Sequence, residues 1–208
     1  MSNTPKPRLT FRHILGWLMV EVLFGRAHYE ITMRLNRRDR QVIRDAMPLT
    51  RDAHADCAQL CAARIFDPAS DASIARLLSA ALAEAGTFKN ATASDVRRRV
   101  QDAKLSIEKL KPIIGALQLR RNQTQAHTDA RPIINPEQYE KAGRVSYREI
   151  NRLFREVGEI LNRFSLLDSG KSVPLDQVVE KYVQSYDAAL NLMAVALTKL
   201  DRRDQKST

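Results

Sequence analysis

Apolar residues recur every three or four positions along most of this chain and rarely alternate with polar residues over the length of a strand. This spacing is typical of amphipathic helices. Prolines and glycines interrupt the pattern at Pro48, Pro68, Gly86 and Gly170. The pattern predicts an all-α protein, an up-and-down bundle of about six helices. They are expected at residues 10–36, 50–66, 70–85, 94–127, 146–164 and 175–200.

The first predicted helix is apolar over most of its circumference. One row of apolar residues recurs near helical spacing: Phe11, Leu15, Leu18, Val22 and Tyr29. Further apolar residues widen this face of the helix: Ile14, Trp17, Met19 and Leu23. A helix with such a wide apolar face is usually central to a bundle or part of a subunit interface.

Several residues suggest where the other helices begin and end. Thr50 or Asp52 is expected to cap the second helix, and Ser94-Asp95 the fourth. Gly86 occupies a position that glycine commonly takes just after a helix. Pro112 either kinks the 94–127 segment or starts a new helix within it.

The composition favours helices and a single domain. Ala, Leu and Arg dominate, and the chain of 208 residues contains only seven glycines. A chain of this length can bury a sizeable core. We therefore expect one domain over residues 1–208, with flexible tails at 1–9 and 201–208.

The net charge is +10 and the isoelectric point is near 9.9. Such a charge favours an anionic partner, with nucleic acid ahead of a membrane, although a basic protein can simply have a charged, solvated surface. Arginines cluster in residues 34–44 and 97–99. On the 146–164 helix, Arg152 and Arg155 belong to a stripe of arginines on one exposed face. Each of the two precedes a glutamate by four residues, so the positive charge of this stripe is expected to be largely neutralised within the helix.

Two cysteines, Cys57 and Cys61, lie one helical turn apart and are expected to face the core. His54 shares their face, which is compatible with a metal ion, but small buried cysteines are common between helices and no further ligand cluster exists. We predict no metal and no cofactor. The apolar run 14–24 is too short to span a bilayer and contains Glu21, and no secretory signal is evident, so a cytoplasmic protein is expected.

Residues 120–129 read RRNQTQAHTD and contain the groups needed to cleave RNA without a metal. Histidine can transfer protons near neutral pH, and arginine can bind phosphate through paired donors. On an unbroken helix, Arg120 and His127 share a face, whereas Arg121 and His127 differ by roughly 120°. Spacing therefore leaves both arginines as candidates. The alternative is a helix end whose basic residues complement the dipole.

Three segments resemble the abortive-infection U branch of the HEPN superfamily. The first is Arg121-Asn122 followed by His127, which is similar to its arginine–polar–histidine motif and ends in AHTD. The second is CAARIFDPASDASIARLL, with Asp67 between two helices. The third is the helix YREINRLFREVGEILNRF, which follows the motif. Together these segments cover about residues 50–165.

The resemblance implies a helical bundle that forms a homodimer, with the motifs of two chains building one ribonuclease site. Members often act as toxins or phage-defence nucleases, and some are non-catalytic binders. It further implies that Arg121 binds phosphate, Asn122 is the polar residue beside it, and His127 is the acid–base group. Arg120 and Gln123 are expected to contact RNA, and Gln123 stands where this branch commonly has lysine. The expected partners are RNA, a second copy and an antitoxin-like protein.

Overall fold

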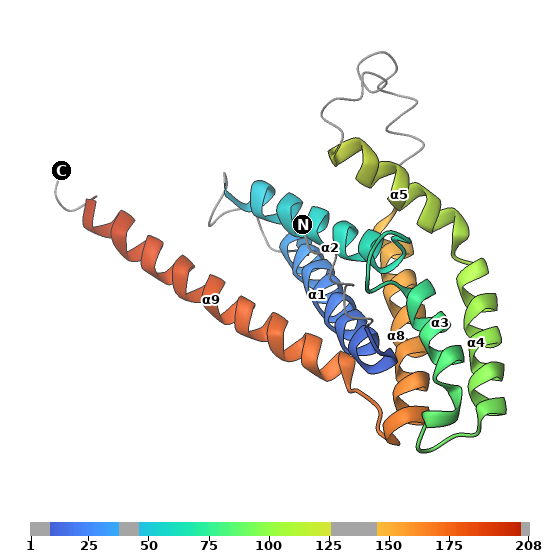
Figure 1. The fold of residues 1–208 in the computed structure, drawn as a ribbon. Coiled ribbons are helices and arrows are strands. Elements are labelled where there is room, and N and C mark those ends of the chain that lie inside the picture. The colour runs from blue at the N-terminus through green and yellow to red at the C-terminus, as the bar shows by residue number, and fades with distance from the viewer. Residues whose placement is uncertain (1–8, 38–45, 126–144, 205–208) are drawn as a thin grey trace, which may run out of the picture.

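The computed structural model describes residues 9–37, 46–125 and 145–204, and this part of the chain contains helices and no strand. The prediction of an all-α protein is confirmed. The elements follow one another along the chain and are labelled in Figure 1. They are α1 (Phe11–Arg37), α2 (Ala46–Ile65), α3 (Ile74–Ala83), the 3-10 turn η1 (Ala85–Thr87), α4 (Ala93–Glu108), α5 (Lys111–Gln125), α8 (Tyr147–Ser169) and α9 (Leu175–Asp204).

The start of α2 and the end of α3 differ from the prediction. Helix α2 begins at Ala46, so Pro48 lies in its first turn, where a missing backbone N–H costs little. Thr50 and Asp52 therefore lie inside the helix and do not cap it. Helix α3 ends at Ala83, and Gly86 lies in η1 without a left-handed backbone.

Pro112 starts a new helix and does not kink a continuous one. Helix α4 ends at Glu108 and α5 begins at Lys111, which places the proline in the first turn of α5. The cap of α4 is Thr92, two residues before the predicted Ser94. The Asp95 amide donates to Thr92 Oγ1 (3.2 Å) and the Thr92 amide donates to Asp95 Oδ2 (3.2 Å), so the two residues form a capping box.

Helix α8 runs through the centre of the fold. Ser146 and Glu149 form a capping box at its start, and Gly170 ends it with a φ of 72°, a left-handed conformation that glycine adopts without strain. The helix extends to Ser169, five residues past its predicted end at 164. Its inward face is apolar: Ile150, Leu153, Phe154, Val157, Ile160, Leu161 and Phe164.

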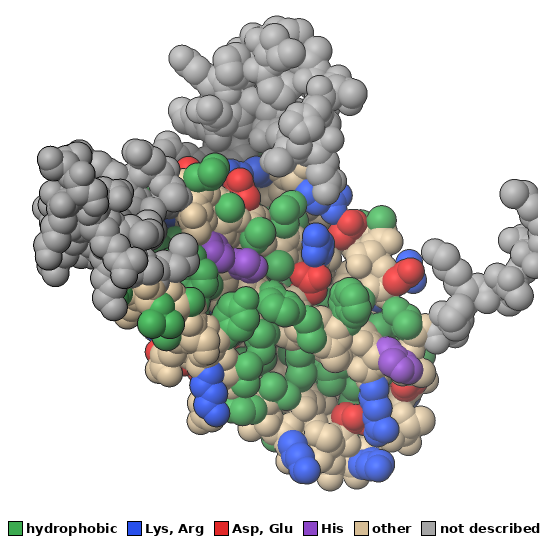
Figure 2. Space-filling model, turned by 90° about the vertical axis from the view of Figure 1, so that its left-hand side faces the viewer, with side chains coloured by type: hydrophobic (Ala, Val, Ile, Leu, Met, Phe, Trp, Pro, Cys, Tyr) green, Lys and Arg blue, Asp and Glu red, His purple; other side chains and the backbone are tan. Residues whose placement is uncertain are grey.

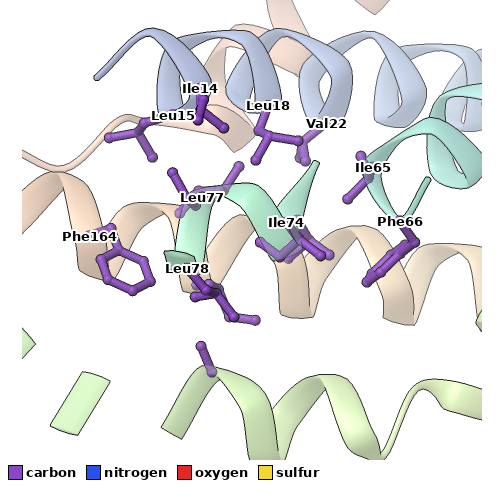
Figure 3. Packing of buried hydrophobic residues seen from close by; sticks show 14 of the residues in the cluster. Ile14, Leu15, Leu18, Val22, Ile65, Phe66, Ile74, Leu77, Leu78 and Phe164 are labelled. Carbon is purple, nitrogen blue, oxygen red and sulfur yellow. The ribbon is translucent and has the colours of Figure 1, made fainter. Parts of the chain in front are cut away.

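The main core lies where α1, α2, α3 and α8 meet. Figure 3 shows Leu18 and Val22 of α1 on one side and Leu77 of α3 below them, with Phe164 of α8 and Ile65 of α2 at the two ends. All five side chains are buried. The periodic apolar positions of separate helices therefore meet in one continuous cluster.

Helices α1 and α2 approach closely at Gly25. A Cβ atom there would collide with the ring of Phe154 and lie 3.0 Å from the Cβ of Cys61. Ala58 and Ala62 on the facing side of α2 are also buried. Small residues on both helices thus let the two backbones come together over the ring of Phe154.

Helix α9 packs on a different side of α1. A second cluster joins Ile31 and Leu35 to Val179 and Val183. Arg34 adds ion pairs from α1 to Glu180 (2.9 Å) and Asp187 (2.5 Å). In Figure 1 the C-terminal half of α9 leans away from the other helices. This helix reaches Asp204, four residues beyond its predicted end at 200.

No helix in the described ranges combines the length and the hydrophobicity that a bilayer span requires.

Candidate functional site

The predicted motif begins in the last turns of α5. Arg120, Arg121 and Asn122 lie there with described side chains, and Gln123 lies in the same helix with only its backbone described. His127 falls outside the described residues. The structure therefore describes the arginine half of the motif.

Arg121 is held by a carboxylate on the opposite side of a helix junction. Its Nη1 donates to Asp67 Oδ2 at 2.6 Å, and each side chain is only 22% exposed. Asp67 lies two residues past the end of α2. A charge-assisted bond of this length in a mostly buried setting is stronger than a typical surface pair.

The loop after α2 fixes the orientation of Asp67. The Ala69 amide donates to Asp67 Oδ1 at 3.0 Å, which leaves Oδ2 to accept from Arg121. The Ala69 amide, and after it the Arg121 guanidinium, holds the pKa of Asp67 below its usual value. Asp67 is therefore a charged carboxylate at neutral pH, with one oxygen anchored to the loop and the other to the motif arginine.

Two further contacts fix the end of α5. Gln118 Nε2 donates to the carbonyl oxygen of Phe66 at 3.3 Å, so α5 is attached to the residue just before Asp67. Asn122 Oδ1 accepts from Arg121 Nη2 at 3.4 Å. The guanidinium of Arg121 is thus oriented from both sides, by Asp67 through one nitrogen and by Asn122 through another.

A small cavity of about 30 Å³ lies beside Arg121, between α2 and α5. Arg121 Nε and Gln59 Oε1 are buried and have no hydrogen-bond partner among the described residues, and both side chains line this cavity. A space of this size can hold one water molecule, which would accept from the guanidinium and donate to the amide oxygen.

Arg120 faces a different carboxylate. Its Nη2 lies 3.4 Å from Asp56 Oδ1 of α2, and the two side chains are more exposed than those of Arg121 and Asp67. The adjacent arginines therefore differ in setting, since Arg121 is fixed at the helix junction and Arg120 lies on the surface. Of the two arginines, Arg121 is thus the more firmly positioned.

The prediction that the arginine stripe on α8 is self-neutralised is wrong, since no ion pair joins Arg152 to Glu156 in the described part of the chain. Glu159 pairs with Arg163 at 3.4 Å, whereas no ion pair joins Arg155 to Glu159 in the described part of the chain. Arg155 lines a surface pocket between α8 and the start of α9, together with Arg26. There Arg26 is already paired with Asp176 at 2.5 Å.

The prediction that both cysteines face the core is confirmed for one of them and wrong for the other. Cys61 is buried and Cys57 is exposed. Burial, with a smaller contribution from Glu21, raises the pKa of Cys61 to about 12, so its thiol is inert at neutral pH. Within the described ranges, no group of three or more histidine, cysteine or acidic side chains is arranged to hold a metal ion.

His54 contacts another histidine instead of the cysteines. Its Nδ1 lies 2.6 Å from Nδ1 of His28, and its Nε2 lies 3.2 Å from the hydroxyl of Tyr186. Burial lowers the pKa of His28, and burial and the nearby His28 lower that of His54. One Nδ1–H donates to the other Nδ1 in this contact, and a proton added to the accepting Nδ1 would place two N–H groups face to face. The contact, which links α1 to α2, therefore requires the accepting ring to be uncharged.

Asp67 is the residue whose role sequence reasoning missed. It was visible only as a member of a resembling segment, and nothing in its spacing connects it to an arginine 54 positions later. The one local signal was a carboxylate placed directly before Pro68, where the chain turns between two helices.

The HEPN family model AbiU2 matches residues 20–189, which is more than half of the chain and includes Asp67, Arg121 and His127. Searches of curated proteins and of solved structures find no match.

Proposed function

Since the chain belongs to the AbiU2 family of HEPN proteins, we propose that it is a metal-independent endoribonuclease acting as a toxin or phage-defence effector. Its site is composed of the motifs of two copies of the chain. The observation that carries this proposal is the guanidinium of Arg121, fixed at the end of α5 by Asp67 at 2.6 Å. It lies six positions before His127 in the sequence.

The proposed reaction is a transesterification within RNA. A base removes the proton of a 2′-hydroxyl, whose oxygen attacks the adjacent phosphorus. The bond to the 5′-oxygen breaks as an acid protonates that oxygen, leaving a 2′,3′-cyclic phosphate and a free 5′-hydroxyl. His127 is the acid–base group, and Arg121 stabilises the negative charge that develops on the phosphate oxygens.

Two copies are required by this chemistry because the motif contains one histidine, whereas the reaction uses a base and an acid. A two-fold axis close to the motif supplies the second histidine from the partner chain. The partners are therefore RNA and a second copy of the chain, and an antitoxin-like protein is a further expected partner.

Asp67 is a positioning residue in this proposal. Asp67 accepts a hydrogen bond from one nitrogen of Arg121, and Asn122 accepts a weak one from another. The guanidinium of Arg121 is therefore oriented before RNA binds. Preorganisation of this kind lowers the cost of stabilising the transition state. Arg120, with its exposed pair to Asp56, and Gln123 contribute to RNA binding.

The test is an RNA-cleavage assay in EDTA, comparing the wild type with single substitutions. His127→Ala is expected to slow cleavage about 10²–10⁴-fold. Arg121→Ala removes a charge-assisted contact of about 1.5–3 kcal/mol, which corresponds to roughly ten- to hundredfold. Arg120→Ala is expected to act mainly on salt-sensitive binding. An RNA with 2′-deoxyribose at the cleaved position should bind and remain intact.

Controls separate chemistry from folding. Circular dichroism should give the same helical signal for each variant, and Arg121→Lys tests whether charge without the planar fork suffices. If neither His127→Ala nor the 2′-deoxy substrate slows cleavage, the proposed mechanism is wrong. If Arg120→Ala is the more damaging arginine substitution, the two arginine roles are exchanged.

The alternative function is a non-catalytic dimeric module that binds nucleic acid or an antitoxin-like partner. The observation in its favour is that the Asp67 carboxylate already neutralises Arg121, at 2.6 Å. Purified protein that binds RNA and leaves it intact in EDTA and in the presence of magnesium would favour this alternative.

A further inference from the structure

Three arginines form a row on the outer face of α8. Arg148, Arg152 and Arg155 follow one another at intervals of four and three residues, so they lie within about 60° of one another around the helix. All three are exposed. The row covers about 10 Å of the helix axis, starting in the first turn of α8. One rigid element thus presents three guanidinium groups on the same side, and we call these residues the arginine row.

The charges of the arginine row are unpaired. None of its members makes an ion pair with a carboxylate of the described residues, whereas most other arginines with described side chains do. Two nearby carboxylates of α8 are engaged elsewhere, Glu149 in the capping box and Glu159 with Arg163. Like charges three or four residues apart destabilise a helix. The row therefore costs stability that a bound anion would recover.

Unpaired basic side chains are not spread evenly over the molecule. On the face drawn in Figure 2, hydrophobic side chains occupy the centre, and lysines and arginines lie towards the margins. In the arginine cluster on α4, Arg98 pairs with Asp95 at 3.1 Å and Arg99 pairs with Asp102 at 3.4 Å. That cluster is thus largely neutralised, while the arginine row keeps its full charge.

The arginine row ends at a pocket of about 550 Å³ between α8 and the start of α9. Arg155 lines this pocket, and so does Arg26 of α1, which is paired with Asp176 at 2.5 Å. A pocket of this volume is in the usual range for small organic groups and is large enough for a nucleobase with its ribose. The apolar part of the lining consists of Gly158, Val173, Pro174 and Leu175.

Asn162 contributes a hydrogen-bond donor to the same pocket. Its Oδ1 accepts from the Val173 amide at 2.9 Å, which fixes the orientation of the carboxamide and leaves its NH₂ group to donate to a ligand. Gln177, which is exposed, adds a second carboxamide. Amide groups can bond to the edge of a nucleobase, while the apolar residues of the lining cover its face.

The combination of row and pocket fits a single strand of RNA. Proteins bind single strands with basic side chains that follow the backbone and with sites beside them for unstacked bases. A duplex would offer only its backbone, because its bases are paired, and would leave the pocket empty. A small phosphorylated molecule in the pocket could contact Arg155 but would leave Arg148, two helical turns away, unused.

The row also lies on a neighbour of the motif helix. Helix α8 packs against α5, which carries Arg120 and Arg121 near its end (Figure 1). It also follows the motif directly in the chain, since the motif segment ends before α8 begins. RNA on either side of a bond cleaved at the motif can therefore be held by α8.

We propose that the arginine row and the pocket at its end form a second RNA contact, which binds single-stranded RNA away from the cleaved bond. Arg148, Arg152 and Arg155 contact neighbouring phosphates, and one unstacked base enters the pocket beside Asn162. The proposal rests on the proposed function for RNA as the ligand and extends it. The row and the pocket select for single-stranded RNA, whereas the chemistry of cleavage stays with the motif.

The row is tested by fluorescence anisotropy with a labelled 2′-O-methyl RNA strand of about 12 nucleotides, which cannot be cleaved because it lacks the nucleophile. Affinity is measured between about 50 and 200 mM salt. Each of Arg148→Gln, Arg152→Gln and Arg155→Gln should reduce the steepness of log K against log salt by about 0.7, the value for one phosphate of a single strand.

Two control variants remove the same charge elsewhere. Arg163→Gln takes a paired arginine from the same helix, and Arg97→Gln takes an exposed arginine from α4 that has no ion pair among the described residues. Both should leave the salt dependence unchanged. Circular dichroism should give the helical signal of the wild type for every variant, because all the substituted side chains lie at the surface.

Asn162→Asp tests the pocket. An aspartate oxygen can still accept from the Val173 amide, so the local fold is kept, but the donor is replaced by a negative charge. We expect at least about tenfold weaker binding of the single strand. Asn36→Asp, which adds the same charge at an exposed position of α1, should bind normally. A duplex of the same sequence should bind at least about tenfold more weakly than the single strand and should not respond to Asn162→Asp.

Several results would overturn the proposal. A wild type that does not bind the strand, a salt dependence unchanged in the three row variants, or an equal reduction in Arg97→Gln removes the row. Normal binding by Asn162→Asp, or a duplex that binds as tightly as the single strand, removes the pocket.

The RNA-cleavage assay on the same variants separates this proposal from the proposed function. Binding that depends on the row in a protein that cleaves nothing leaves the second contact standing and removes the ribonuclease. A wild type that cleaves RNA, with row variants that bind and cleave equally well, leaves the ribonuclease standing and removes the second contact.

Discussion

Replacing Asp67 with asparagine should destabilise the fold by about 2 kcal/mol through the loss of one ion pair. The asparagine oxygen can still accept from the Ala69 amide, but its NH₂ group then faces the guanidinium of Arg121. Arg121 is only 22% exposed, and its Nε already lacks a partner among the described residues. The substitution would thus leave a mostly buried cation without its carboxylate.

Removing the arginine should cost less than removing the carboxylate. In Arg121→Met, Asp67 keeps the hydrogen bond from Ala69 at 3.0 Å and can turn its other oxygen to water, so we expect about 1 kcal/mol. The double variant should be less destabilised than the sum of the single variants. The difference between that sum and the effect of the double variant is the coupling free energy of Asp67 and Arg121. It should be about 1–2 kcal/mol because the bond between them is short and partly shielded from solvent.

The wild type, the two single variants and the double variant form a double-mutant cycle. Urea unfolding followed by circular dichroism at 222 nm gives the free energy of unfolding of each. The matched control is the pair of Arg163 and Glu159, at 3.4 Å and about half exposed, which should give roughly 0.2–0.5 kcal/mol. A coupling of less than about 0.3 kcal/mol between Asp67 and Arg121 would refute the argument that this pair fixes the end of α5.

The pH dependence gives a second check on the same pair. The pKa of Asp67 is lowered in the folded protein, so the pair stabilises the fold above the unfolded-state pKa of about 3.9. That contribution is lost as the pH falls through the lower, folded-state pKa. The stability difference between the wild type and Asp67→Asn should therefore be constant near neutral pH and shrink below about 3.9.

Three further predictions concern other sites. Cys57 should react with a thiol reagent at pH 8, while Cys61, whose pKa is raised to about 12, should react only after denaturation; equal rates in the native protein would contradict the burial argument. Because the pKa values of His28 and His54 are lowered in the folded state, stability should fall as the pH drops below about 6.5, and replacing both by glutamine should flatten that slope in urea titrations. Gly25→Ala should cost about 1–3 kcal/mol by overpacking, measurable as a lower urea midpoint, whereas an unchanged midpoint would mean that the adjacent aromatic ring moves freely.

The helices themselves were predictable from the sequence because they depend on contacts between residues three or four positions apart. The apolar period placed each helix close to its observed position, and Pro112 marked a helix start. The errors occur at the ends. Thr92 caps α4 in place of Ser94, and α2 begins before Pro48, because several neighbouring residues can cap or start a helix and tertiary contacts select among them.

The family and the motif were also readable from the sequence, since Arg121, Asn122 and His127 lie within a few residues of one another. The partner of the arginine was not. Asp67 lies 54 positions away, and which carboxylate meets which arginine depends on how α2 and α5 are rotated about their axes and on how deeply they pack.

The same limit explains the cysteines, the histidine pair and the exposed apolar residues of α1. Periodicity indicates that a face is apolar, but it does not determine which neighbour covers it. Cys57 is exposed and Cys61 is buried because α1 packs on only one side of α2. Trp17 is exposed while Ile31, on the same face of α1, is buried because α9 crosses α1 at an angle and covers only one end of it. Local sequence thus determined the helices and their apolar faces, and the tertiary structure alone decided which faces meet, since helix packing depends on side chains distant in the chain.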